Sequence, residues 1–251
     1  SAAELVNANF VAREIFGSLA FRTELATFDN QLDAALQTRM RLEMRTLVER
    51  ASRWLVTHRR APLDSEGLAE FFAGPVQETM KVLPEIMTGK EQVAFVERTK
   101  FLVGKGVPEE LAIRTAVLPS SYALLSIVET ATREGLAPDV VARAHFGVGE
   151  RLGLPAVVGR IVALPREDRW QTMARAALRD ELYDVHAQLT SQVLATDSDD
   201  EATDTKLSAW EASQHGAVSR AEETLGEICS DDQADLARMS VALRVVRGLL
   251  A

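Results

Sequence analysis

The sequence has 251 residues, 47% of them hydrophobic and 26% charged, which is the composition of a folded globular chain and excludes a disordered or fibrous one. Asp and Glu outnumber Lys and Arg by 37 to 28, so no domain-wide basic surface exists for nucleic acid. With one cysteine, Cys229, no signal peptide and no apolar stretch of about 18 residues, the chain is expected to be cytoplasmic, with no membrane partner.

The apolar residues recur at helical spacing along almost the whole chain, and no segment alternates as a β-strand would. The spacing predicts a first helix over 2–16, begun by Ser1 and Glu4 as a capping box, and a short helix near 19–28. A long helix is predicted over 31–59, because this stretch has neither Gly nor Pro and carries one apolar stripe. The predicted fold is all-α, a multi-helix bundle of short and long helices.

Proline and glycine interrupt the chain between residues 60 and 89. Each proline removes a backbone donor that the interior of a helix needs, so only short helices are expected here. Short helices cover a neighbouring surface more readily than they build a core. We therefore expect exposed apolar surface for docking in this stretch, at Phe71, Phe72, Ile86 and Met87.

Further helices follow between start and stop residues. They are predicted from Val93 to Gly104, Pro108 to Val117, Pro119 to Gly135, 138–152, 154–164 and 167–195.

The acidic run from Asp197 to Asp204 carries five carboxylates, which repel one another and offer little apolar surface for packing. This run is predicted to be a solvated linker or the acidic start of a helix. Two closing helices that fold back as a C-terminal hairpin are expected after it. The predicted organisation is a helical domain over 1–195, an acidic linker over 196–206 and a terminal helical hairpin over 207–251.

Two segments, 3–17 and 139–153, resemble each other. In both, a helix and a glycine are followed by a short helix and then by a long one. One interpretation is a duplicated unit of about 55 residues that packs on its copy. The alternative is a chance likeness of two Ala- and Val-rich helices. The alignment pairs Leu5 with Val141, Ala8 with Ala144, Phe10 with Phe146, Glu14 with Glu150 and Gly17 with Gly153.

The sequence offers no clear phosphate-binding loop. Gly147, Gly149 and Gly153 lack both the preceding strand and the spacing of a dinucleotide-binding turn, so they are interpreted as glycines at the end of a helix. No cofactor-binding residue is therefore predicted in this chain.

Metal and nucleophile candidates are equally weak. None of the four histidines has another histidine three or four residues away, as a metal site on one helix would require. The best combination is Asp180, Asp184 and His186, but His186 falls on another helix face. Cys229 lies among carboxylates, which raise the pKa of a thiol and suppress its thiolate. No metal-binding or catalytic residue is predicted.

Two tryptophans lie in the predicted long helices. Trp54 falls on an apolar face whose helix ends at Arg59 and Arg60, where cations suit the helix dipole. Trp170 lies at the start of another helix, after acidic residues that suit its positive end. Both tryptophans are predicted to be buried packing residues.

Four runs of the sequence carry a resemblance to a known family: RASRWLVTHRRAPLD (50–64), GVPEELAIRTAVLPS (106–120), GERLGLPAV (149–157) and LPREDRWQTMARAALRDELY (164–183). They closely resemble the C-terminal end of the large bacterial NAD-dependent glutamate dehydrogenases. The likeness spans about residues 1–195, whereas 196–251 match only loosely.

The resemblance implies a homo-oligomeric parent enzyme, a tetramer, that converts L-glutamate, NAD and water to 2-oxoglutarate, ammonia and NADH. In that family the glutamate- and NAD-binding parts lie upstream of the region matched here. The resemblance therefore assigns no catalytic residue, cofactor-binding residue or metal to this segment. Its expected partner is the catalytic core of the same chain.

The reading we adopt is a non-catalytic helical segment that is structural or regulatory for the upstream core. The alternative is an independent helical protein–protein interaction module with no enzymatic parent. A ligand-sensing transcription regulator is a third reading, which the acidic charge disfavours. An open reading frame of about 250 codons would exclude the adopted reading.

Overall fold

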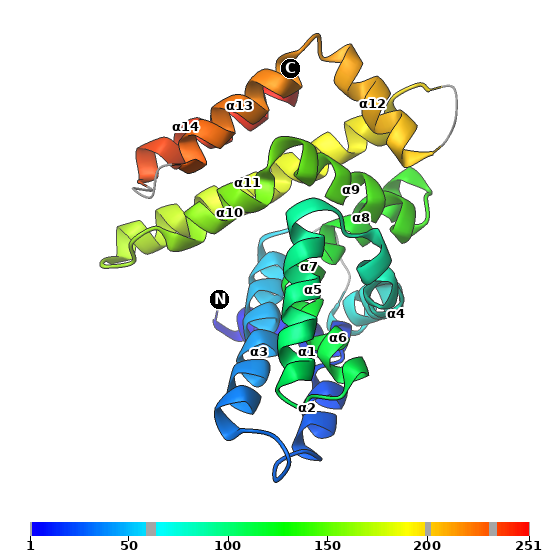
Figure 1. Cartoon of the computed structure of the whole chain (residues 1–251), viewed down its shortest axis with the longest axis vertical. Helices are drawn as coiled ribbons and strands as arrows, with labels where there is room; N and C mark the ends of the chain where they lie inside the picture. Colours follow the sequence, from blue (N-terminus) through cyan, green and yellow to red (C-terminus); the bar gives the residue numbers. More distant parts are fainter. Residues whose placement is uncertain (1, 59–63, 199–201, 231–234, 251) are drawn as a thin grey trace. The chain divides into compact units, whose positions relative to one another are not determined.

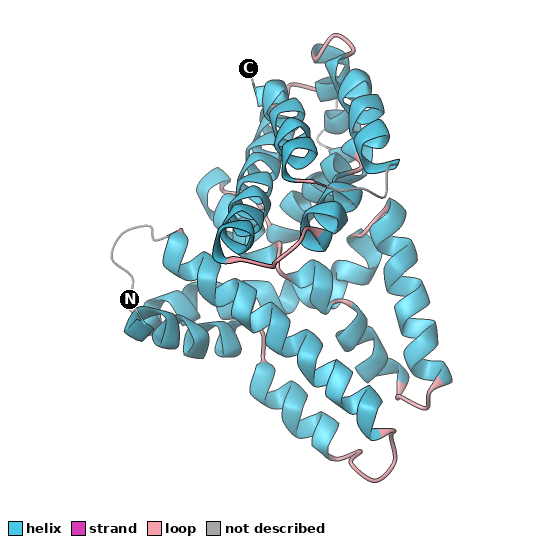
Figure 2. Ribbon diagram, turned by 90° about the vertical axis from the view of Figure 1, so that its left-hand side faces the viewer, coloured by secondary structure: helices cyan, strands magenta, loops and turns pink. Residues whose placement is uncertain are grey.

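The computed structural model describes residues 2–58, 64–198, 202–230 and 235–250. Within these ranges the regular structure is entirely helical, as the sequence predicts, and Figure 2 shows helices joined by short loops without a strand. Contacts divide the chain into two compact units. Unit 1 comprises 1–87 and 91–132, and unit 2 comprises 88–90 and 133–251. The predicted capping residue Ser1 lies outside the described residues.

Unit 1 is built around its first and third helices. Helix α1 packs against both α3 and α4, and α3 also contacts α2, α6 and α7. Figure 1 labels the helices and colours them along the chain. Helices α5 and α8 each cross the boundary between the units. The elements are α1 (Ala2–Ile15), α2 (Ser18–Ala26), α3 (Ala34–Thr57), α4 (Ser65–Ile86), α5 (Gly89–Gly104), α6 (Glu109–Ala116), α7 (Leu118–Ser121) and α8 (Leu124–Glu134).

The long helix α3 confirms the sequence prediction. Asp33 caps its start by accepting a hydrogen bond from the backbone N–H of Leu36 at 2.9 Å, which satisfies one of the unpaired donors of a first turn. Its buried residues include Trp54, whose ring stacks on His58 at 4.7 Å and meets Phe72 edge-on at 5.9 Å. Trp54 is therefore a core residue, as predicted.

The stretch expected to hold only short helices is instead one helix, α4, of 22 residues. Asp64 caps it through the backbone N–H of Gly67, so that glycine belongs to the first turn. Pro75 and Pro84 lie inside the helix, each at a cost of about 3 kcal/mol. The prediction was wrong because tertiary packing outweighs that cost. The buried residues of α4 keep helical spacing across both prolines: Ala69, Phe72, Val76, Thr79, Leu83 and Ile86.

The proposed docking residues of this stretch are corrected with it. Phe72, Ile86 and Met87 are buried, and Phe71 is half-buried with its ring edge-on to Phe72 at 4.7 Å. They pack in the core of unit 1 and do not form an exposed surface.

The helix predicted from Pro119 to Gly135 is two helices, α7 and α8. The break falls at Tyr122 and Ala123, both of which are buried. Turning the chain at this point places buried residues of both helices, among them Ser121 and Leu124, in the core.

Unit 2 is built around α9 and α11. Helix α11 contacts α9, α10, α12 and α14, while α13 contacts α9, α10 and α14. In the part of the chain that the structure describes, three α-helices lie from Thr203 onward, where two helices were expected, and the first of them begins within the acidic run. The elements are α9 (Pro138–Leu152), α10 (Leu154–Ala163), α11 (Arg169–Ala195), α12 (Thr203–Ser213), α13 (Ala217–Ser230), α14 (Leu236–Arg247) and a 3-10 helix, η1 (Gly248–Leu250).

The burial predicted for Trp170 is wrong. Asp168 caps α11 through the backbone N–H of Gln171 at 2.8 Å, so Trp170 is the second residue of the helix. No residue from Arg169 to Leu178 is buried, and Trp170 is 72% exposed. An apolar residue at the right helical spacing lies in the core only if another element covers that turn.

The two aligned segments have the same local structure. In α1–α2 the chain turns at Gly17 (φ 62°, ψ 35°), and in α9–α10 it turns at Gly153 (φ 64°, ψ 27°). Glycine suits both turns because positive φ strains residues with a Cβ. Each turn leads through a short helix into a long one, and α1 packs on α3 as α9 packs on α11.

Candidate functional site

The glycines of α9 serve helix packing. A Cβ built on Gly147 would lie 2.4 Å from Leu207 Cδ1, and one on Gly149 would lie 3.3 Å from His186 Cε1. These glycines let α12 and α11 approach α9 closely. They lie inside a helix, whereas a pyrophosphate requires free backbone N–H groups at a helix N-terminus. Their arrangement therefore does not fit NAD.

A histidine pair lies in the interior of unit 2. His145 on α9 and His186 on α11 stack with ring centroids 3.6 Å apart, and His186 Nε2 lies 2.7 Å from the backbone oxygen of His145. Burial lowers the pKa of His186 to about 4 and that of His145 well below 6.5, where the neighbouring His186 adds to the effect. Both imidazoles are neutral at pH 7. The two histidines are 41 residues apart in the sequence, so no local sequence pattern indicates that they pair.

The acidic residues near His186 are engaged in another way. Asp180 Oδ1 accepts hydrogen bonds from Arg179 Nε at 3.1 Å and from Arg179 Nη2 at 2.9 Å. Arg179 is buried, so this neighbouring carboxylate neutralises a buried cation. In the part of the chain that the structure describes, no three His, Cys, Asp or Glu residues are grouped so as to hold a metal ion.

Cys229 is half-buried near the end of α13. Burial raises the pKa of its thiol, and the charges of Arg160 and Lys90 oppose that rise. The direction matches the sequence prediction, but the cause is burial and not the neighbouring carboxylates. Arg160 also donates two hydrogen bonds to the backbone oxygen of Cys229, at 3.1 and 2.7 Å.

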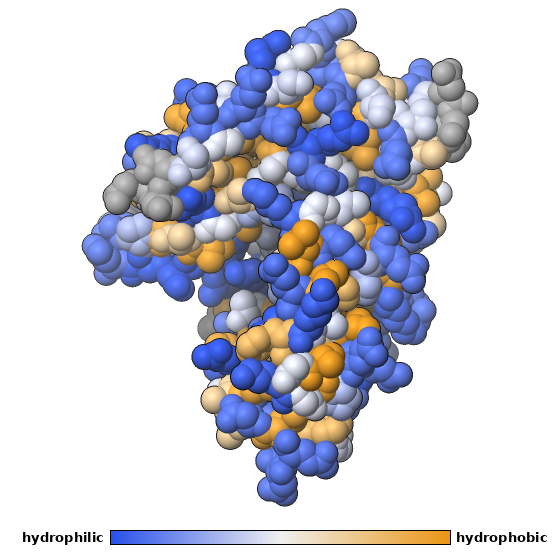
Figure 3. Space-filling view, in the orientation of Figure 1, coloured by the Kyte–Doolittle hydropathy of each residue, from blue (hydrophilic) through white to orange (hydrophobic). Residues whose placement is uncertain are grey.

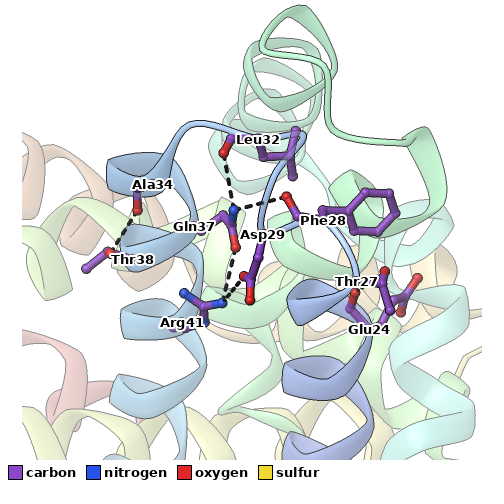
Figure 4. Close-up of polar contacts among 9 residues, drawn as sticks. All are labelled: Glu24, Thr27, Phe28, Asp29, Leu32, Ala34, Gln37, Thr38 and Arg41. Carbon is purple, nitrogen blue, oxygen red and sulfur yellow. Dashed lines mark hydrogen bonds and ion pairs between the residues drawn. The ribbon is translucent and has the colours of Figure 1, made fainter.

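A polar network orders the loop between α2 and α3 (Figure 4). The buried Gln37 donates from Nε2 to the backbone oxygens of Phe28 and Leu32, both at 3.2 Å. Arg41 donates to Gln37 Oε1 at 3.1 Å and to Asp29 Oδ1 at 2.9 Å. The amide of Gln37 thus holds the loop on α3, and Arg41 holds the amide.

Helix α5 carries an ion pair and apolar surface. Arg98 pairs with Glu43 of α3, and burial raises the pKa of Glu43 against the lowering effect of that arginine. Arg98 and Lys105 both lie within 6 Å of the Phe101 ring, at 5.5 and 5.8 Å from its centroid. Figure 3 shows apolar side chains gathered over α5, where Val93, Phe101 and Val103 are exposed.

Another group of exposed apolar residues in unit 1 belongs to α1. Leu5, Val6 and Phe10 are 43%, 55% and 64% exposed, and we call these three residues the α1 outer face. The buried side of α1 includes Ala8, Ala12 and Ile15. Apolar surface, and not a cluster of reactive side chains, is therefore the main candidate for a functional contact.

Comparison with known proteins places the chain. Residues 1–248 match the family described as "Glutamate dehydrogenase, C-terminal". The chain belongs to this family. The match continues to residue 248, although residues 196–251 were expected to be only loosely similar.

None of the described helices combines the length and the apolar composition that a membrane span requires.

Three relatives of this glutamate dehydrogenase C-terminal segment are each named NAD-specific glutamate dehydrogenase. The protein from Mycobacterium tuberculosis is 36% identical over 217 residues, 86% of this chain. Those from Halomonas elongata and Pseudomonas aeruginosa are 28% and 29% identical over 96% and 99% of it. The segment spans only 13–15% of the length of these relatives.

Proposed function

We propose that this segment is a non-catalytic, structural or regulatory part of an NAD-specific glutamate dehydrogenase and docks on the catalytic core of the same chain. Membership of the C-terminal family carries the proposal, together with the small share of each relative that the segment covers. The whole enzyme would convert L-glutamate, NAD and water to 2-oxoglutarate, ammonia and NADH. That chemistry would take place in the part upstream of this segment.

The engagement of the chemically capable side chains supports a non-catalytic role. His145 and His186 stack on each other in the interior, and Asp180 neutralises the buried Arg179. Gly147 and Gly149 admit neighbouring helices. Each of these groups has a structural partner, so its presence is accounted for without a catalytic role.

Deleting residues 1–251 from the full-length enzyme tests the proposal. We expect a lower melting temperature or a disturbed assembly, because the core loses its cover. Turnover per correctly assembled molecule should stay largely intact, since residues without transition-state contacts do not change kcat. A truncated enzyme that assembles and melts normally but loses turnover by orders of magnitude would contradict the proposal.

Calorimetric titration of the 251-residue chain with NAD and NADH is a second test, after circular dichroism has verified its helices. We expect no tight binding, because the α9 glycines do not form a site for the pyrophosphate. Micromolar affinity would show that the segment takes part in cofactor binding.

We also infer that the full-length protein is cytoplasmic and forms a homo-oligomer, a tetramer. The support is the resemblance to the large bacterial enzymes of this family. Light scattering of the purified full-length protein measures its mass, and a mass of one subunit at micromolar concentration would refute the inference.

A further inference from the structure

Helix α1 has a buried apolar side and further apolar residues that are exposed. The side with Ala8, Ala12 and Ile15 is buried as α1 packs on α3 and α4. The exposed residues form the α1 outer face, and no charged residue occurs from Leu5 to Ala12. Surface helices normally keep one polar side, whereas helices that are apolar all round are covered on all sides. Between Glu4 and Arg13, the exposed side of α1 is thus more apolar than that of an ordinary surface helix.

The aligned helix of unit 2 shows what such a cover looks like. Val141 and Ala142, which align with Leu5 and Val6, are 0% exposed, and Phe146, which aligns with Phe10, is 1% exposed. Helix α9 has contacts with α12 and α13 in addition to α10 and α11, whereas α1 contacts α2, α3 and α4. The side of α9 that corresponds to the α1 outer face is therefore buried by helices of its own chain.

Helices α1 and α9 are buried alike at other aligned positions. Ala8 and Ala12 of α1 are buried, and so are Ala144 and Val148, which align with them. Ala8 and Ala12 thus pack inward as their aligned residues do, and the difference lies at the three residues of the α1 outer face. Among the described helices of unit 1, none takes the place that α12 and α13 have beside α9.

We propose that the α1 outer face is covered, in the full-length enzyme, by a helix from the part of the same polypeptide that precedes this segment. The inference rests on the proposed function. The family is C-terminal, and the relatives have most of their length outside the match, so such a part exists in them. A part of the same polypeptide is tethered to this segment and therefore reaches the face at high effective concentration.

The chemistry of the face selects the partner. Leu5, Val6 and Phe10 offer no charge for an acidic or basic ligand, and Arg13 lies 5.8 Å from the Phe10 ring at the rim. An apolar centre with a charged rim fits the apolar stripe of another helix. Burying such residues provides roughly 1.5–3 kcal/mol for each large side chain, or about 10- to 100-fold in binding.

Thiol labelling measures the cover directly. In the full-length enzyme with Cys229→Ser, Phe10→Cys and Leu42→Cys are labelled separately with a maleimide, and mass spectrometry follows each peptide. Leu42 of α3 is a matched control, because it is apolar, lies in the same unit and is 55% exposed. We expect the Phe10→Cys thiol to react at least about 10-fold more slowly than the control and to reach its rate in denaturant. Val6→Cys provides a second reporter.

A photo-cross-linker on the Phe10→Cys thiol identifies the occupant. A cross-link to a peptide that precedes the segment supports the proposal. A cross-link to this segment in a second copy, seen in assemblies of mixed isotope content, overturns it, as does equal labelling of all three thiols. Neither readout involves turnover, so equal labelling would reject the α1 contact and leave the deletion test to judge the proposed function.

Discussion

The imidazole rings of His145 and His186 lie face to face in the interior of unit 2, with centroids 3.6 Å apart and planes within 16°. His186 Nε2 lies 2.7 Å from the backbone oxygen of His145, which ties α11 to α9. Burial keeps both rings neutral near pH 7, because a charged ring would lose its hydration there without gaining a carboxylate. The pair therefore makes the stability of this unit sensitive to acid.

The first prediction concerns this acid sensitivity. In the unfolded chain the histidines bind protons near pH 6.5, whereas in the folded chain the pKa of His186 is about 4 and that of His145 is also lowered. At these two histidines the unfolded state binds more protons in this interval, so their contribution to the free energy of unfolding falls as the pH falls from 6.5. The expected slope is about 1.4 kcal/mol per pH unit for each histidine.

Urea unfolding at a series of pH values checks this dependence. His186→Gln should make the free energy of unfolding depend less steeply on pH below 6.5, because glutamine does not titrate. His215→Asn is the control: His215 is exposed and has φ 48°, a conformation that asparagine tolerates. Equal acid slopes in the parent and His186→Gln would contradict the role of the pair.

A second prediction separates the two tryptophans. Trp54→Ala should destabilise the chain by about 3–5 kcal/mol, since it removes a buried ring that packs on Phe72 and His58. Trp170→Ala should change the stability by no more than about 0.5 kcal/mol, because Trp170 is exposed. Thermal unfolding of the two variants tests this prediction. A large loss of stability in Trp170→Ala would show that another element covers the start of α11.

Gly147 is predicted to resist substitution. In Gly147→Ala the new methyl group would meet Leu207, so overpacking should cost about 1–3 kcal/mol despite the better helix propensity of alanine. In a Leu207→Ala background, which removes the contacted methyl groups, Gly147→Ala should cost less than it does in the parent. Gly159 of α10 is the matched control, because nothing lies within 4 Å of a Cβ there. Gly159→Ala should stabilise the chain by roughly 0.5–1 kcal/mol in denaturant unfolding.

The loop between α2 and α3 depends on Gln37. Gln37→Ala removes its hydrogen bonds to the backbone oxygens of Phe28 and Leu32, and it should cost about 1–3 kcal/mol because Gln37 is buried. Thr38→Ala, which removes an exposed bond to Ala34 in the same helix, should be nearly neutral. Hydrogen exchange of residues 28–33 reports the loop itself, and unchanged protection in Gln37→Ala would show that the network does not hold it.

Local patterns carried most of the helix assignment. The apolar stripe of α3 repeats over successive turns of one helix, so it is readable from the chain alone. The same holds for the glycine turns after α1 and α9. The prolines of α4 are the exception, because their effect depends on how firmly the flanking turns are packed.

The candidate site was less accessible to this reasoning. The stacked histidines are 41 residues apart, and Gln37 reaches backbone oxygens that bear no sequence signal. Arg98 and Glu43 pair across 55 residues. Such contacts depend on which faces of two helices pack together, and the spacing of apolar residues along one helix does not identify its partner.

The sequence by itself determined an all-α chain, the location of the long helices α3 and α11 and the resemblance to the glutamate dehydrogenase C-terminal family, because periodicity and motifs are local properties. Only the tertiary structure decided which apolar stripes are covered. Trp54 is buried and Trp170 exposed although both suit an apolar helix face, and Phe146 is buried while the aligned Phe10 is not. Burial depends on the neighbour that a turn of helix meets, and that neighbour comes from distant parts of the chain.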